Sequence, residues 1–97
     1  MFFFQIKGSN GQNPLRNLKQ VRAQKVDGWV NSLRVIDNEL YCCVGKAIEV
    51  YSLDLQPRRS ITSSSVGEFY DVAEKDKDHI FGATYEGLFV FTKSGNT

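Results

Sequence analysis

The sequence predicts an all-β fold of short antiparallel strands, and two features of the residue pattern predict it. Runs rich in β-branched and aromatic residues alternate with clusters of Gly, Asn, Asp and Ser, which is typical of strands separated by turns. No window of helical length keeps an apolar stripe at the 3.6-residue spacing of an amphipathic helix. A chain of 97 residues is ordinarily one small domain with a modest core.

The chain also contains an internal repeat. A shift of 40 residues aligns residues 18–57 with residues 58–97 without a gap, and apolar positions agree far better than identities. A period near 40 residues predicts a repeated unit of four strands. The identical pairs are Val26/Val66 and Val50/Val90, and the apolar pairs are Val21/Ile61, Trp29/Phe69, Val30/Tyr70, Leu40/Ile80, Tyr41/Phe81, Cys43/Ala83, Ile48/Leu88 and Tyr51/Phe91.

The expected strands follow one another with short polar turns between them. An outer strand over residues 58–66 matches residues 18–26, and it completes a four-stranded antiparallel unit. The first strand of the unit can be aligned in two ways, because residues 31–33 match either of two segments that differ by one residue. The other strands are expected near residues 30–36, 39–44 and 47–53 in the first unit, and near residues 69–73, 78–84 and 87–92 in the second.

These units predict a fragment of a β-propeller with four-stranded antiparallel blades. Residues 1–17 would form the third strand of a partial blade and a connecting loop, since residues 2–11 resemble residues 88–97. Residues 18–57 would form one blade-like unit, and residues 58–97 a second unit that is incomplete at its C-terminus. The alternative is a single small β-sandwich, which also has short, closely spaced strands. We favour the propeller because a sandwich does not predict one spacing for both sets of aromatic pairs.

The stretch "DVAEKDKDHIFGATYEGLFVFTKSGN" resembles the NHL type of β-propeller repeat. Such repeats run Asp-Val-Ala, a turn, a strand, then Val-Phe and a turn with Gly. The resemblance implies a propeller like those at the C-terminus of tripartite-motif ubiquitin ligases, where the propeller binds substrate. It covers most of residues 26–97, but no RING-type or B-box-type ligand series is present. About two and a quarter blades cannot close a ring that needs four or more, so missing blades or a homo-oligomer would be needed.

Composition excludes several classes of protein. Twelve basic and eleven acidic residues give a net charge of +1, so no general attraction to nucleic acid or an anionic membrane is expected. The N-terminal "MFFFQIKGS" is too short for a signal peptide or a spanning segment, which predicts a cytoplasmic protein with no membrane partner. Cys42 and Cys43 are adjacent, so their side chains should point to opposite faces of a strand as buried free thiols.

Candidate contact residues are few, and we expect no catalytic, cofactor-binding or metal site. The basic side chains on the two outer strands could contact RNA phosphates, although a charged edge strand explains them more simply. Most aromatic side chains are expected in the core, and two tyrosines are expected to reach solvent. The possible partner or RNA contacts are Arg22, Lys25, Arg58, Arg59, Tyr70 and Tyr85.

The expected function is that of a non-catalytic interaction module that binds a protein partner. No nucleophile with a base, carboxylate pair or metal cluster occurs at a convincing spacing, and no cofactor is expected. The first alternative is an RNA-binding propeller fragment that uses the basic edge. A weaker alternative is a fragment of a propeller enzyme whose catalytic groups lie in absent blades.

Overall fold

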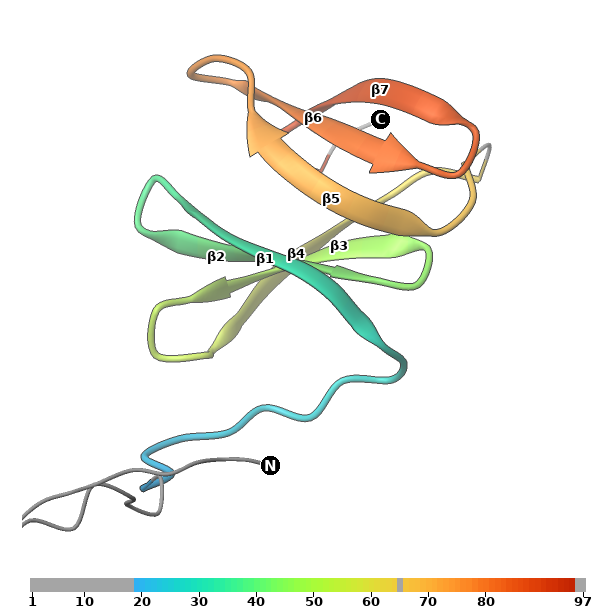
Figure 1. Ribbon diagram of the computed structural model, residues 1–97. Helices are drawn as coiled ribbons and strands as arrows, with labels where there is room; N and C mark the ends of the chain where they lie inside the picture. The colour runs from blue at the N-terminus through green and yellow to red at the C-terminus, as the bar shows by residue number, and fades with distance from the viewer. Residues whose placement is uncertain (1–18, 65, 96–97) are drawn as a thin grey trace, which may run out of the picture.

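The computed structural model describes residues 19–64 and 66–95, which form seven antiparallel strands in two sheets and contain no helix. In each sheet the strands are ordered as in the chain. The second sheet lies over one face of the first (Figure 1). The first sheet contains β1 (Val30–Ile36), β2 (Glu39–Val44), β3 (Ala47–Ser52) and β4 (Pro57–Thr62), and the second contains β5 (Phe69–Glu74), β6 (His79–Thr84) and β7 (Gly87–Thr92).

The predicted all-β class is confirmed, and all six of the inner strands expected in the two units are present within a residue of their predicted ends. The prediction for the outer strands was partly wrong. β4 ends at Thr62, where the chain leaves the first sheet for the second, and residues 19–26 form no strand. A strand needs a neighbour for its backbone hydrogen bonds, and no described strand lies beside residues 19–26. The strand expected within residues 1–17 lies outside the described residues.

The register of the strands settles the alignment of the two units. Leu33 lies opposite Cys42 in the first sheet, and Val72 lies opposite Gly82 in the second. Residues 31–33 therefore correspond to residues 70–72, a shift of 39 residues, whereas the later strands keep the shift of 40. The extra residue lies in the β5–β6 turn, which is longer than the tight β1–β2 turn.

The β1–β2 turn is a two-residue hairpin connection. Asp37 and Asn38 have φ angles of 55° and 60°, which is the left-handed pair that a type I′ turn requires. Asn and Asp tolerate this region better than other residues with a side chain. The turn holds Asp37 where it can contact the second sheet.

The main core lies between the two sheets. Alternation along β2 and β3 points Tyr41, Cys43, Ile48 and Val50 toward the second sheet, and each is at most 1% exposed. Ile61 on β4 pairs with Ile48 and points the same way, whereas Val66 of the β4–β5 connection and Phe69, Val72 and Ile80 of the second sheet pack against this face, with Phe89 and Phe91 beside them.

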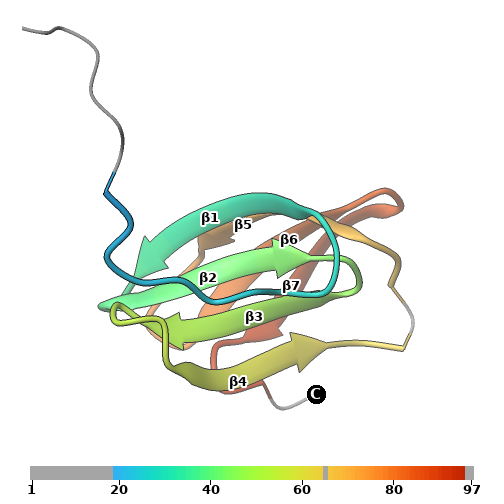
Figure 2. The ribbon, with the colours of Figure 1, turned by 90° about the horizontal axis from the view of Figure 1, so that it is seen from below.

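A smaller cluster covers the opposite face of the first sheet. It contains Cys42, Val44 and Tyr51, with Val26 and Leu40 packed against them. Figure 2, which views this face, shows the segment before β1 crossing it. The two cysteines therefore point to opposite faces, as predicted, and both are free and buried.

Two aromatic residues that were expected in the core are exposed. Trp29 is 84% exposed, because it lies in the segment before β1 and not in a strand. Phe81 is 41% exposed, because it points away from the first sheet.

Within residues 19–64 and 66–95, no helix is long and apolar enough to cross a membrane.

Candidate protein-interaction surface

The face of the second sheet that points away from the first sheet is apolar. Cross-strand pairing places Phe81 opposite Val90 and Ala83 opposite Leu88, and directly opposite residues share a face of an antiparallel sheet. Leu88 is 80% exposed and Val90 is 50% exposed. We call the surface formed by Phe81, Ala83, Leu88 and Val90 the outer apolar face.

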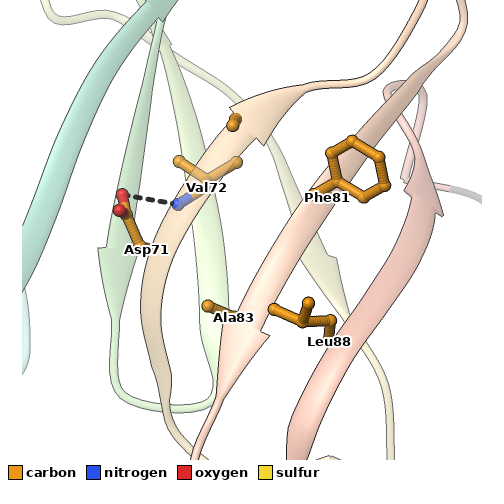
Figure 3. Close-up of a pocket in the computed structure, with 6 residues that line it drawn as sticks. Asp71, Val72, Phe81, Ala83 and Leu88 are labelled. Carbon is orange, nitrogen blue, oxygen red and sulfur yellow. Dashed lines mark hydrogen bonds between the residues drawn. The ribbon is translucent and has the colours of Figure 1, made fainter.

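The outer apolar face has a shallow hollow between β5 and β7. Figure 3 shows the side chains of Phe81, Ala83 and Leu88 around it, with β5 forming one side. Asp71 lies at the edge of the hollow, where its Oδ1 accepts a hydrogen bond of 2.8 Å from the backbone N–H of Val72. The hollow thus joins an apolar floor to one carboxylate, which suits contact with another protein surface better than a chemical reaction.

The equivalent face of the first sheet is fully buried. The repeat matches Phe81 with Tyr41 and Leu88 with Ile48, and both residues of the first sheet are 0% exposed beneath the second sheet. Ala83 and Val90 correspond in the same way to two other buried residues. The outer apolar face therefore has the composition of a surface that, in the same chain, is covered by a sheet.

A polar seam ties the edges of the two sheets together. Lys93 is 7% exposed, and its Nζ donates to Asp37 Oδ2 at 2.7 Å and to Glu74 Oε2 at 2.6 Å. Burial of the ammonium opposes its charge, but the hydrogen bonds to these two carboxylates and the attraction of their negative charges together outweigh burial and raise the pKa of Lys93. The Phe69 N–H also donates to the Gly45 carbonyl across the sheets. The seam fixes the relative position of the sheets.

The second part of the seam is built around Arg34. Its Nε donates to the Val72 carbonyl at 2.9 Å, and its Nη2 lies 3.3 Å from Asp71 Oδ1. Ser32 donates to the same carboxylate oxygen at 2.7 Å. Hydrogen bonds from Ser32, the Val72 N–H and Arg34 lower the pKa of Asp71. The inner strands β1 and β5 are therefore joined by polar contacts that surround the apolar core.

The predicted basic contacts do not form a free cationic surface. Arg59 donates from both terminal nitrogens to Glu39, at 3.1 and 2.9 Å, and also to the Tyr41 hydroxyl. Its hydrogen bond is the main reason that the pKa of Glu39 lies below its ordinary value of 4.5. Arg58 lies 3.5 Å from the same carboxylate. Glu39 therefore offsets one of the two positive charges that these arginines would offer to a phosphate.

The other predicted contact residues are exposed. Arg22 and Lys25 lie on the segment before β1, and Tyr70 and Tyr85 are 45% and 84% exposed, which confirms that both tyrosines reach solvent. Tyr70 is the unpaired residue between the two ladder positions at the start of β5. The predicted set is thus divided among the segment before β1, β4, the start of β5 and the β6–β7 turn.

Groups that could carry chemistry are engaged in structural contacts. Burial raises the pKa of the Cys43 thiol to about 12, which keeps it protonated and unreactive at neutral pH. His79 Nδ1 lies 2.8 Å from Asp76 Oδ1 at the exposed β5–β6 turn. Among residues 19–64 and 66–95, no group of three or more His, Cys, Asp or Glu side chains could hold a metal ion.

Reasoning from the sequence missed the outer apolar face and Lys93. The face could have been found by asking which repeat partner lacks a neighbour, since the Tyr41/Phe81 and Ile48/Leu88 pairs were visible. Lys93 offered no such signal, because its counterpart Leu53 is apolar.

No protein-family model matches the chain, and neither curated proteins nor solved structures gave a match. The resemblance to the NHL repeat therefore stays a prediction from the sequence.

Proposed function

We propose that the chain is a non-catalytic interaction module, a fragment of a β-propeller that binds a protein partner through the outer apolar face. The observation that carries the proposal is the exposure of Phe81, Leu88 and Val90 side by side. Contiguous exposed apolar side chains on a soluble domain are typical of interaction sites. A protein partner would cover them as the second sheet covers the equivalent residues of the first.

The stacking of the sheets supports the propeller part of the proposal. Each sheet has its strands in chain order, and the first strand of the second sheet packs against β1, β2 and β3. Consecutive antiparallel sheets that stack face to face at a period near 40 residues are the arrangement of propeller blades. The sandwich alternative explains the stacking of two sheets, but it does not explain why equivalent residues occupy the same position in each.

The states of the polar side chains support a non-catalytic role. A nucleophile or general base needs a free, correctly placed side chain in a site that holds substrate. In the described parts of the chain, Cys43 is buried beneath a sheet, and Glu39 is held by Arg59. The only carboxylate at the hollow, among the residues that line it, is Asp71, which accepts three hydrogen bonds from its own chain.

A photoreactive amino acid at position 88 tests the proposal directly. In cells that make the chain, it should form adducts with a protein that mass spectrometry identifies, and the same probe at Ser94 should not. The identified protein is then titrated against the wild type and the Leu88→Asp and Ser94→Asp variants. We expect at least tenfold weaker binding for Leu88→Asp only. Equal affinity for all three would overturn the proposal, and steeply salt-dependent binding of single-stranded RNA would favour the basic residues instead.

A further inference from the structure

We infer that the protein partner of the outer apolar face is a second copy of this chain. Residues 19–22 of that copy would pair with the free edge of β7, and its first sheet would cover the outer apolar face. This inference rests on the proposed function and names its partner. It follows from the way in which the two sheets of one copy already meet.

A strand beside the free edge of β7 would occupy the position in the second sheet that β4 occupies beside β3 in the first sheet. β4 pairs with β3, and Ile61 lies opposite Ile48 in that ladder. Among residues 19–64 and 66–95, no strand pairs with the corresponding edge of β7. An unpaired edge strand presents a row of backbone N–H and C=O groups to any chain that can add a strand.

Residues 19–22 stand 40 residues before residues 59–62 of β4, whose pairing with β3 is the template for that missing strand. Val21 stands 40 residues before Ile61, and Leu88 stands 40 residues after Ile48. Val21 is 84% exposed and Leu88 is 80% exposed, whereas Ile61 and Ile48 are 1% and 0% exposed. Placing Val21 opposite Leu88 would reproduce between two copies the cross-strand pair that is buried within one copy.

The path of the chain after each segment agrees with this placement. After β4 the chain reaches Val66, which is 5% exposed and packs in the core between the sheets. Its counterpart Val26 packs against the outward cluster of the first sheet. Val26 therefore lies against the first sheet as Val66 lies against the second. The segment is placed to complete a sheet that lies against the outer side of the first sheet.

The outward side of the first sheet supplies the surface that would cover the outer apolar face. Leu33 and Leu40 lie there, and they correspond to Val72 and Ile80, which cover the equivalent face within one copy. Leu33 is 58% exposed. Two different surfaces would thus meet in a head-to-tail contact, which continues from copy to copy instead of pairing one face with itself.

The first experiment measures the mass of the full chain by light scattering coupled to size exclusion. We expect the wild type to give at least twice the 11.0 kDa of one chain, and Leu88→Asp or Val21→Asp to give single chains with unchanged circular dichroism. The matched controls are Ser94→Asp, where the first unit already carries Asp54, and Gln20→Asp, whose counterpart Ser60 is exposed. Both controls should keep the wild-type mass.

Mixing the two interrupted variants tests the head-to-tail geometry. The Leu88→Asp copy keeps an intact segment, and the Val21→Asp copy keeps an intact outer apolar face. Their mixture should form a dimer through the one intact junction and then stop. If the face paired with itself, Val21→Asp would associate like the wild type and Leu88→Asp would stay a single chain in the mixture, and that result overturns the inference.

Disulfide trapping tests the register. Copies with Val21→Cys and copies with Leu88→Cys should form a crosslinked dimer under mild oxidation, and copies with Gln20→Cys should crosslink to Leu88→Cys at least fivefold less. A wild type that stays a single chain at every concentration overturns the second-copy inference. The proposed function survives that outcome if a different protein captured at position 88 binds in a Leu88-dependent way, and fails with it if none does.

Discussion

The two sheets present the same apolar face to opposite surroundings. Tyr41 and Ile48 lie on β2 and β3 beneath the second sheet, and their repeat partners Phe81 and Leu88 lie on β6 and β7 in solvent. The register of β2 with β3 matches that of β6 with β7, and the compared residues are apolar in both sheets. The sequence of a repeat unit therefore specifies which face is apolar, whereas the burial of that face depends on the neighbour that packs on it.

The largest expected effect comes from truncating one residue of such a pair. Ile48→Ala should lower the free energy of unfolding by about 2–5 kcal/mol, because it removes a fully buried side chain and leaves a cavity. Leu88→Ala at the equivalent position should change it by no more than about 0.5 kcal/mol, as is usual for exposed sites. Urea unfolding followed by circular dichroism in dilute solution measures both.

The loss of unfolding free energy caused by these two substitutions should depend differently on protein concentration. If a second copy covers the outer apolar face, the cost of Leu88→Ala should grow as the protein concentration rises, because association stabilises the folded state by mass action. The cost of Ile48→Ala should change far less. Equal costs for the two substitutions in dilute solution would contradict the difference in burial on which the comparison stands.

The next largest effect concerns Glu39, whose repeat partner is His79. The Glu39 side chain is 17% exposed beside Arg59 and has its pKa lowered by that hydrogen bond, so Glu39→Gln should cost about 1.5–3 kcal/mol at neutral pH. A lowered pKa contributes stability that is present above its ordinary value of 4.5 and is lost as the pH falls through the lowered value. The gap between wild type and variant should therefore narrow on acidification.

His79→Gln is the matched control at the equivalent position. Its side chain is 40% exposed and bonds only the neighbouring turn, so the substitution should change the free energy of unfolding by no more than about 0.5 kcal/mol. A gap for Glu39→Gln that stays constant from pH 7 down to pH 3 would show that the charge of Glu39 does not stabilise the fold.

Much of the fold could be predicted because strand signals are local. Turn residues and β-branched or aromatic runs located the inner strands of both units within a residue of their ends. The strand pairing of the structure was needed to resolve the one-residue ambiguity in aligning β1 with β5. Leu33 and Val72 could be matched only through their cross-strand partners Cys42 and Gly82. Residues 19–26 were predicted to be a strand but form none, for the same reason that the outer apolar face is exposed. In both cases the outcome depends on whether a neighbouring strand or sheet is present.

A smaller effect is expected at Gly82, whose repeat partner is Cys42. A Cβ on Gly82 would lie 2.9 Å from Cε1 of Phe69 and 3.1 Å from Cε2 of Phe91. The two rings pack edge to face with centroids 5.5 Å apart, so Gly82→Ala should force them to shift at a cost of about 1–3 kcal/mol. Thermal unfolding measures the loss.

The control for Gly82 is Ala83→Val, one residue along β6 on the outer apolar face. We expect a change within about 0.5 kcal/mol, because the added methyl groups meet solvent. If Gly82→Ala were equally harmless, the rings would have room to move and the second sheet would be less tightly packed than its equivalent positions imply.

The candidate site was harder to predict than the fold because its residues are ordinary strand residues. Arg59 was predicted as a contact residue because of its charge, but its guanidinium donates hydrogen bonds to Glu39 and Tyr41 of the same sheet. Leu88 was assigned to a repeated apolar pattern, and nothing in its own sequence indicates that it is 80% exposed. Exposure and pairing are tertiary properties, and a residue type alone does not report them.

The smallest expected effect is at the Arg34–Asp71 ion pair, which joins the two sheets. The counterpart of Arg34 in the second sheet is Ala73, which carries no charge. Both side chains are about half exposed, so a double-mutant cycle with Arg34→Ala and Asp71→Ala should give a coupling of about 0.2–1 kcal/mol. The cycle removes the separate contribution of the bond from Arg34 to the Val72 carbonyl. Because the pKa of Asp71 is lowered, the coupling should be present above the ordinary carboxyl value of 3.8 and fade as the pH falls through the lowered value. A junction between copies would lack this pair, since Ala73 offers no cation. A coupling well above 1 kcal/mol would therefore mean that the junction within one copy depends on a polar contact that the junction between copies cannot form.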